Sequence, residues 1–156
     1  MAPEPILEAP EGTDQPDLYV GVASADMTPE EVVGKQVQSI RDAVDSPESI
    51  RECFALASPG NRKLTGPVER FADMVMTEPY AILAKAPEIQ VGTAVTEDEY
   101  AAVLVTAVAE TGVPAAFRFI LERQALAPYE GCWMTVAVEV VTVESGTNGL
   151  SANSLR

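Results

Sequence analysis

The residues of this chain best suited to proton transfer are two glutamates, Glu122 and Glu139, in segments with a strand-like sequence. Alternate residues of a strand face opposite sides of a sheet, so either glutamate could lie in the interior. Burial penalises the ionised form of a carboxyl group, and a buried glutamate could therefore act as a general base. The alternative is that both glutamates face water or pair with Arg118 or Arg123.

Arg118 and Glu122 could also bind a small polar ligand if their side of the strand faces a pocket. The alternative places the phenylalanines and the leucine between 117 and 121 in the core and leaves Arg118 and Glu122 on a polar face. Aromatic residues combine apolar area with a polar group, and four could line a pocket or pack in the core: Tyr80, Tyr100, Tyr129 and Trp133. The candidate ligand-binding residues are Tyr80, Arg118, Glu122 and Trp133.

The chain contains no histidine, which excludes a Ser-His-Asp triad, a Cys-His dyad and a histidine-ligated metal. Its two cysteines, Cys53 and Cys132, are too few for a cysteine-only zinc site or an iron–sulfur cluster, and they form no CxxC motif. We expect two buried thiols, with a single disulfide as the alternative. No catalytic residue, metal site or cofactor is predicted.

The charge balance excludes further classes of function. Ten Lys and Arg residues stand against 24 Asp and Glu residues, which gives a net charge of −14. Binding to nucleic acids or to anionic membranes needs clustered basic residues, so neither partner is expected. No stretch of 18 or more apolar residues occurs, so we predict a soluble chain without a membrane span.

Residues 1–27 differ from the rest of the chain, because they contain six acidic residues, four prolines and no basic residue. Such a segment cannot bury enough apolar surface to offset its ordering entropy, and we interpret it as an extended arm. It is either a solvated leader without a role or an anchor on a partner or on the domain. The anchoring residues would be Ile6, Leu7, Leu18, Tyr19 and Val20.

A short basic segment, Asn61–Lys63, stands out in this acidic chain. It is either a solvated loop or a contact for an anion or an acidic partner. Arg62 and Lys63 are therefore candidate partner-binding residues.

Three helices are expected before residue 80. The first begins with Thr28 as the N-cap and Glu31 completing a capping box, and its apolar residues recur at helical spacing up to Val44. The second begins with Ser46 as the N-cap and stops at a turn over 58–61, where Ser, Pro, Gly and Asn follow one another. The third follows Pro67 and runs to Pro79.

Four strands are expected after the helices, over residues 88–95, 100–110, 116–126 and 132–143. A helix over 97–110, capped by Thr96, is the alternative for the second of them. Short turns favour antiparallel neighbours, so the sequence predicts an α+β domain in which three helices pack on a curved four-stranded antiparallel sheet. The domain spans residues 28–144, and residues 145–156 form a polar tail.

Four strings within residues 28–143 resemble an uncharacterised domain family of bacteria and plastid-bearing eukaryotes: Ala57–Arg62, Thr65–Phe71, Phe119–Gln124 and Tyr129–Thr135. That family is similar to the nuclear-transport-factor-2-like superfamily, also called SnoaL-like or cystatin-like. The resemblance implies a cone in which a curved sheet and helices enclose a pocket. It implies no activity, because fold alone does not carry function.

We expect a non-catalytic interaction module, such as an accessory subunit docked on a larger complex. The plastid members of the family point to a photosynthetic complex, and to a plastid location if a transit peptide has been removed. Self-association through the open sheet face is a further expectation from the resemblance. The alternative function is a small-molecule-binding protein or an enzyme that uses the interior of the cone.

Overall fold

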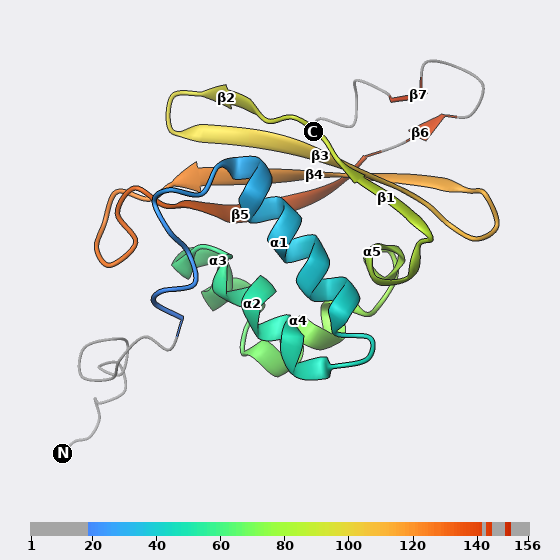
Figure 1. The fold of residues 1–156 in the computed structure, drawn as a ribbon, viewed down its shortest axis with the longest axis horizontal. Coiled ribbons are helices and arrows are strands. Elements are labelled where there is room, and N and C mark those ends of the chain that lie inside the picture. The colour runs from blue at the N-terminus through green and yellow to red at the C-terminus, as the bar shows by residue number, and fades with distance from the viewer. Residues whose placement is uncertain (1–18, 142, 145–148, 151–156) are drawn as a thin grey trace.

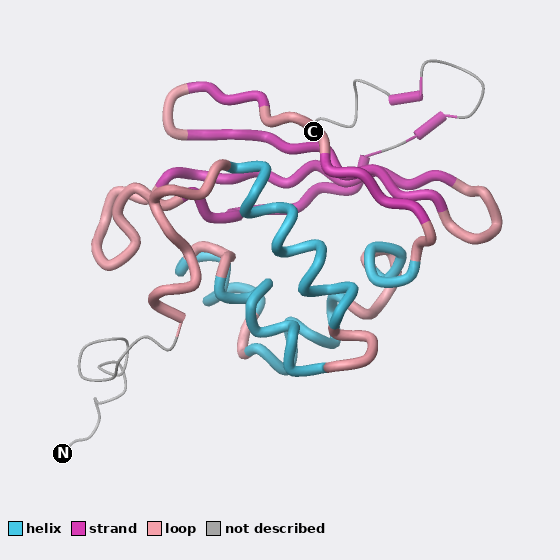
Figure 2. Tube along the Cα trace, in the orientation of Figure 1, coloured by secondary structure: helices cyan, strands magenta, loops and turns pink. Residues whose placement is uncertain are grey.

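The computed structural model describes residues 19–141, 143–144 and 149–150. It confirms the α+β class, with helices first and a five-stranded antiparallel sheet after them. All the labelled helices lie on one side of the sheet (Figures 1 and 2). None of the helices in the described residues is both long and apolar enough to cross a lipid bilayer.

The first helix, α1 (Pro29–Asp42), begins as the sequence predicts. The Thr28 hydroxyl accepts the Glu31 N–H at 3.1 Å, and the Glu31 carboxylate accepts the Thr28 N–H at 2.9 Å. This capping box satisfies backbone donors that the first turn leaves without partners. The apolar face of α1 is buried against the sheet and the other helices, with Val32 and Val33 completely covered.

The remaining helices are shorter than α1. They are the 3-10 turn η2 (Pro47–Ser49), α2 (Ile50–Ala55), α3 (Pro59–Thr65), α4 (Val68–Val75) and α5 (Ala81–Lys85). The Ser46 side chain makes no capping hydrogen bond, contrary to expectation.

The predicted turn over 58–61 is wrong, because α3 begins there. The Ser58 hydroxyl accepts the Asn61 N–H at 3.1 Å, and Pro59 occupies the first helical position, where its missing N–H costs nothing. The helix α5 was not expected either. Arg41 holds it against α1 by donating to the carbonyls of Leu83 at 3.0 Å and Ala86 at 2.7 Å.

The main sheet has five strands: β1 (Glu88–Val91), β2 (Val95–Glu97), β3 (Tyr100–Val108), β4 (Pro114–Arg123) and β5 (Trp133–Val141). Its order is β1-β3-β4-β5, and β2 pairs with the same edge of β3 as β1 does. The prediction of four strands is wrong because the 88–95 segment is divided at Gly92. The Gly92 backbone passes so close to β3 that an added Cβ would lie 3.0 Å from the Leu104 carbonyl oxygen.

The helical alternative for 97–110 is wrong, since residues 100–108 form the central strand β3. Two short strands follow the main sheet and pair with each other, β6 (Val143–Glu144) and β7 (Gly149–Leu150). The predicted tail otherwise lies outside the described residues.

Alternation along β4 separates the two faces of the sheet. Phe117, Phe119 and Leu121 face the helices and are at most 3% exposed. Arg118 and Glu122 alternate with them and face away from the helices. Alternation of this kind is what one buried face requires.

The chain before α1 also contacts the core. Tyr19, Val22, Ala23 and Met27 pack against it, and the Tyr19 ring meets Phe54 edge-on with centroids 5.4 Å apart. Residues 19–27 therefore lie against the domain. Of the expected anchors, Ile6, Leu7 and Leu18 lie outside the described residues, and Val20 is exposed.

Candidate functional site

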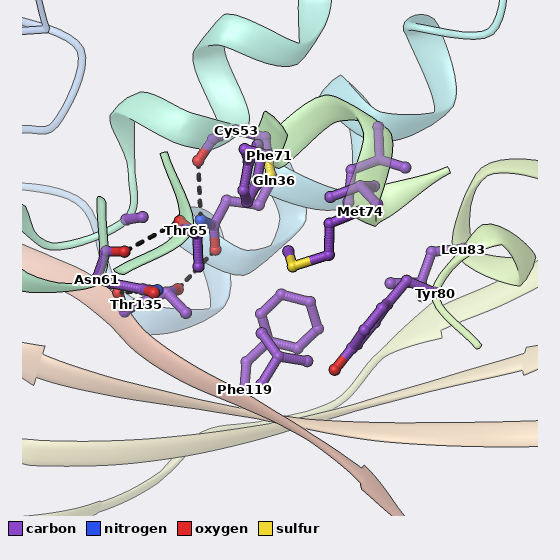
Figure 3. A pocket seen from close by; sticks show the side chains of 14 residues that line it. Gln36, Cys53, Asn61, Thr65, Phe71, Met74, Tyr80, Leu83, Phe119 and Thr135 are labelled. Carbon is purple, nitrogen blue, oxygen red and sulfur yellow. Dashed lines mark hydrogen bonds between the residues drawn. The ribbon is translucent and has the colours of Figure 1, made fainter. Parts of the chain in front are cut away.

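A pocket of about 150 Å³ lies between the helices and the covered face of the sheet (Figure 3). Its wall is mostly apolar, and the polar side chains of Gln36, Asn61, Thr65 and Thr135 gather at one end. The lining residues are Gln36, Ile40, Cys53, Ala57, Asn61, Thr65, Phe71, Met74, Val75, Tyr80, Leu83, Phe119, Thr135 and Val138.

The floor and the mouth of this pocket differ in exposure. The floor includes Gln36, Cys53 and Thr135, which are 2–3% exposed. Met74 and Tyr80 are more exposed and lie toward the mouth, where Met74 is 37% exposed. The polar groups deepest in the pocket are therefore buried, whereas Met74 on α4 and Tyr80 before α5 are partly exposed.

The polar end of the pocket is a connected hydrogen-bond network. The Thr135 hydroxyl donates to Gln36 Oε1 at 2.6 Å, and Gln36 Nε2 donates to the Cys53 carbonyl at 3.1 Å. Asn61 Nδ2 donates to the Thr135 carbonyl at 3.2 Å, and the Thr65 hydroxyl donates to the Asn61 carbonyl at 3.0 Å. Every side chain in this network is uncharged at neutral pH.

Backbone pairing holds the two sides of the network together. The Ser58 N–H donates to the Thr135 carbonyl at 2.8 Å, and the Thr135 N–H donates to the Leu56 carbonyl at 3.0 Å. These bonds make a parallel bridge between Ala57 and Thr135. The segment between α2 and α3 is thereby fixed to the edge of β5, and Asn61 is held beside Thr135.

The cysteine in the pocket is not an activated nucleophile. Burial raises the pKa of the Cys53 thiol far above its ordinary range, with a smaller contribution from the charge of Glu52. Burial also raises the pKa of Cys132. Both cysteines are free and buried, and a neutral thiol is a poor nucleophile.

Tyr80 is the candidate ligand-binding residue that lines this pocket. Its ring is tilted against Phe117, with centroids 5.9 Å apart. Trp133 lies elsewhere in the core, 9% exposed, with the Arg123 guanidinium 5.4 Å from its ring centroid. Of the two other tyrosines considered as pocket residues, Tyr129 is buried beside Cys132 and Met134, and Tyr100 is half exposed.

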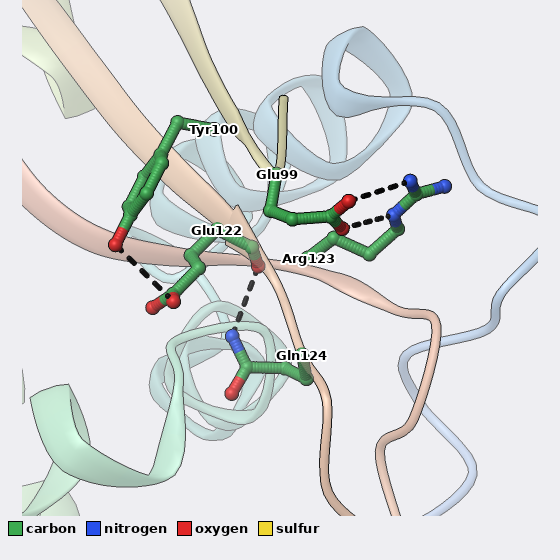
Figure 4. Close-up of polar contacts among 5 residues, drawn as sticks. All are labelled: Glu99, Tyr100, Glu122, Arg123 and Gln124. Carbon is green, nitrogen blue, oxygen red and sulfur yellow. Dashed lines mark hydrogen bonds and ion pairs between the residues drawn. The ribbon is translucent and has the colours of Figure 1, made fainter. Parts of the chain in front are cut away.

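The interior placement of Arg118 and Glu122 is wrong, because both residues face away from the helices. Arg118 pairs with Glu139 at 3.4 Å, and Glu122 accepts the Tyr100 hydroxyl at 3.3 Å. Figure 4 shows the second contact. On this face the side chains meet water and one another, so neither glutamate has the desolvated environment that a general base needs.

The same end of the sheet carries a two-bond ion pair between Arg123 and Glu99 (Figure 4). Hydrogen bonding to Arg123 lowers the pKa of the Glu99 carboxyl, and the same bond raises the pKa of Arg123. Because both side chains are exposed, water screens this pair strongly.

Arg62 and Lys63 lie on α3 and not on a loop. The Arg62 guanidinium donates to the carbonyls of Ala55 at 3.1 Å and Ala57 at 2.9 Å, and to the Tyr129 hydroxyl at 3.1 Å. It also lies 4.9 Å from the Tyr19 ring centroid. Arg62 thus connects the N-terminal segment to the domain, whereas the Lys63 side chain is exposed.

Sequence reasoning missed Gln36, Asn61 and Thr135 as site residues. A signal for Gln36 exists, because it interrupts the apolar face of α1 three residues after Val33 and four before Ile40. Thr135 similarly interrupts the apolar run of β5. Polar residues at core positions need buried partners, and here they are each other's partners.

Metal binding and the comparisons with known proteins complete the description of the site. Within the described residues, no group of three or more Cys, Asp or Glu side chains could hold a metal ion. A family model described as a domain of unknown function (DUF4864) matches residues 23–147, a range that includes every residue of the pocket. No curated protein matches the chain.

Proposed function

The chain belongs to the DUF4864 family, which confirms the expectation of an uncharacterised domain family, and we propose that this member is a non-catalytic binding module. Its ligand is a small, uncharged and largely apolar molecule held between the helices and the sheet. The observation that carries this proposal is the neutral network of Gln36, Thr135 and Asn61 at one end of an apolar pocket.

The network has hydrogen-bonding capacity for a ligand. A glutamine amide has two N–H donors and a carbonyl with two lone pairs, and Gln36 uses one donor on Cys53 and one lone pair on Thr135. The Asn61 amide has similar capacity beyond its bond to Thr135. A ligand with one hydroxyl or carbonyl group would add a bond to this end of the pocket.

The size and the wall of the pocket define the rest of the ligand. In an engineered protein, a dry cavity of about 150 Å³ lined by apolar side chains binds benzene. The pocket between the helices and the sheet has a volume of about 150 Å³, so a single ring suits it. The Phe71 and Phe119 side chains supply aromatic surface. A charged ligand is disfavoured, because no lining residue carries the opposite charge and burial of an unpaired ion is costly.

The absence of acid–base groups among the lining residues supports binding without turnover. None of them is Asp, Glu, Lys or Arg. Burial raises the pKa of the Cys53 thiol, so this lining residue stays neutral near pH 7. General acid–base catalysis near pH 7 needs a group that titrates there.

Nuclear magnetic resonance titration with benzyl alcohol and with benzoate tests this proposal. We expect benzyl alcohol to shift the signals of Gln36, Asn61 and Thr135, and benzoate to leave them unchanged. Val138→Phe narrows the pocket and should abolish the shifts. The matched control is Val140→Phe, on the same strand and half exposed outside the pocket. Equal shifts with benzoate, or shifts that survive Val138→Phe, would contradict the proposal.

Association with a protein is a second candidate function, favoured by apolar side chains on the uncovered side of the sheet. Val95 on β2 is 73% exposed and Tyr100 on β3 is 52% exposed. Light scattering of the full chain tests self-association through this face. A dimer that Tyr100→Ser dissociates would support it, and a monomer at all concentrations would contradict it.

The resemblance described above adds finer proposals. The sheet and helices would form the cone of nuclear-transport-factor-2-like proteins, and the domain would be an accessory subunit of a larger complex, a photosynthetic one in plastids. The helix-covered antiparallel sheet supports the first of these. Co-migration of the native protein with a membrane complex at moderate salt tests the second, and a protein that never co-migrates would contradict it.

A further inference from the structure

A basic groove surrounds the point where the described chain begins. Tyr19 lies at its centre and lines two shallow hollows, one with Lys35 and Arg51 and the other with Phe54, Arg62 and Lys63. We call the two hollows together the Tyr19 groove. The Tyr19 ring is held in place by its contacts with Phe54 and Arg62.

The Tyr19 groove concentrates positive charge on an acidic protein. It contains four of the ten Lys and Arg residues of the chain. One acidic residue, Glu52, also lines it and lies 4.0 Å from Lys35. The side chains of Arg51 and Lys63 are exposed on the two sides. Apolar surface from Phe54, Pro59 and Pro67 lies between the charges.

Residues 1–18 have the complementary charge. They contain five acidic residues, Glu4, Glu8, Glu11, Asp14 and Asp17, and no Lys or Arg. An extended chain advances at most about 3.6 Å per residue, so Asp17 is held within roughly 7 Å of the Tyr19 backbone. Tethering of this kind gives a segment a high effective concentration at a nearby site. The segment lies outside the residues that the family model matches.

We propose that the Tyr19 groove is a binding site for an acidic peptide, and that its occupant is the chain's own segment of residues 1–18. The carboxylates of the segment lie along Arg51, Lys35 and Lys63. Its apolar residues Ile6 and Leu7 cover the Phe54 side of the groove. An acidic peptide of another protein binds only by displacing this segment.

Paramagnetic relaxation in the full chain tests the proposal. A nitroxide label on Glu8→Cys should reduce the amide signal intensities of Lys35, Arg51 and Lys63. The two native cysteines are buried, at 3% and 6% exposed, and labelling is therefore directed to the new site. The intensities should return in about 1 M salt, where the Debye length is about 3 Å.

Charge substitutions provide the matched controls. Arg51→Gln combined with Lys63→Gln should restore the intensities at low salt, whereas Lys85→Gln on α5 should not. A label on Glu110→Cys, in the turn between β3 and β4, should leave the groove signals unchanged. Full intensity at the groove with the Glu8 label would overturn the proposal. The same measurement on a mixture of spin-labelled copies and isotope-labelled copies detects contacts between molecules. Intensity losses in that mixture would show that the segment of a second copy occupies the groove, and they would also overturn the proposal.

Discussion

The two faces of the sheet use polar residues in opposite ways. Between the helices and the covered face, Gln36 of α1, Asn61 of α3 and Thr135 of β5 are uncharged and bonded to one another or to the backbone. On the uncovered face, Arg118, Glu122 and Glu139 are charged and contact other polar side chains near water.

This difference between the two faces indicates where a ligand-binding site can lie in a strongly acidic chain. Ionised groups are costly to bury, so the residues with the strongest chemistry remain on the solvated face. The groups left for the interior are amides and hydroxyls, which can select a ligand by hydrogen bonding. These amides and hydroxyls are the groups on which the proposed ligand binding depends.

The largest difference in unfolding free energy between the two faces is expected for alanine substitutions at two neighbouring residues of β4. Leu121→Ala removes a completely buried side chain and should reduce the free energy of unfolding by about 2–5 kcal/mol. Ile120→Ala changes a partly exposed side chain on the opposite face and should cost about 1 kcal/mol. Denaturant unfolding measures both, and equal losses would show that the uncovered face is also packed.

A second, smaller effect is expected within α1. Gln36→Leu leaves the Thr135 hydroxyl and the Cys53 carbonyl without their partner and should cost about 1–3 kcal/mol. Gln38→Leu is the control, because Gln38 is exposed and bonds Asp42 on the same helix. Its effect on the unfolding free energy should be within about 0.5 kcal/mol. A stabilised Gln36→Leu variant would mean that the buried network is dispensable for folding.

The sequence predicts the class and the order of elements, because capping residues and alternation are local signals. The capping box at Thr28 and the alternation of Phe117, Phe119 and Leu121 are both confirmed. The start of α3 at Ser58 was missed, although Ser58-Pro59 repeats the arrangement of Thr28-Pro29. Glycine after Pro59 was interpreted as a turn signal, and the hydrogen bond from Asn61 prevails over it.

The candidate site was predicted less well than the fold. Tyr80 lines the pocket, whereas Arg118 and Glu122 lie on the other face. The pocket depends on Asn61 meeting Thr135 across 74 positions of sequence. No periodicity within one element contains information about such a distant contact.

A third test concerns a charge at the boundary between the helices and the sheet. The Glu30 carboxylate accepts the Ala94 N–H at 2.8 Å, and this bond is the main cause of its lowered pKa. Since the pKa is lower in the folded state, the stabilisation is complete above the ordinary carboxyl pKa of about 4.3. It is lost as the pH falls through the folded value.

The corresponding variant is Glu30→Gln. It should cost about 1 kcal/mol or less at pH 7, because water screens this partly exposed carboxylate, and the difference from the parent should shrink below about pH 4. Urea unfolding at several pH values measures it. A difference that is constant with pH would show that ionised Glu30 is not what holds Ala94.

The smallest effect is expected for the ion pair on the uncovered face. A double-mutant cycle with Arg118→Ala and Glu139→Ala should give a coupling of about 0.5 kcal/mol, because Glu139 remains partly exposed. High salt should reduce the coupling further. A coupling as large as the loss for Gln36→Leu would remove the contrast between the two faces.

The backbone bridge at Thr135 determines how the molecule can open. Ser58 and Thr135 are locked by main-chain bonds across the edge of β5, whereas the main-chain bonds described for α4 and Tyr80 are all local. Among the elements that line the pocket, α4 and the turn before α5 are then expected to fluctuate more than the segment at Ser58. Amide hydrogens of Ser58 and Thr135 should exchange slowly with deuterium while those of α4 exchange fast. If the pocket binds a ligand as proposed, the motion of this one short helix would influence how long that ligand stays bound.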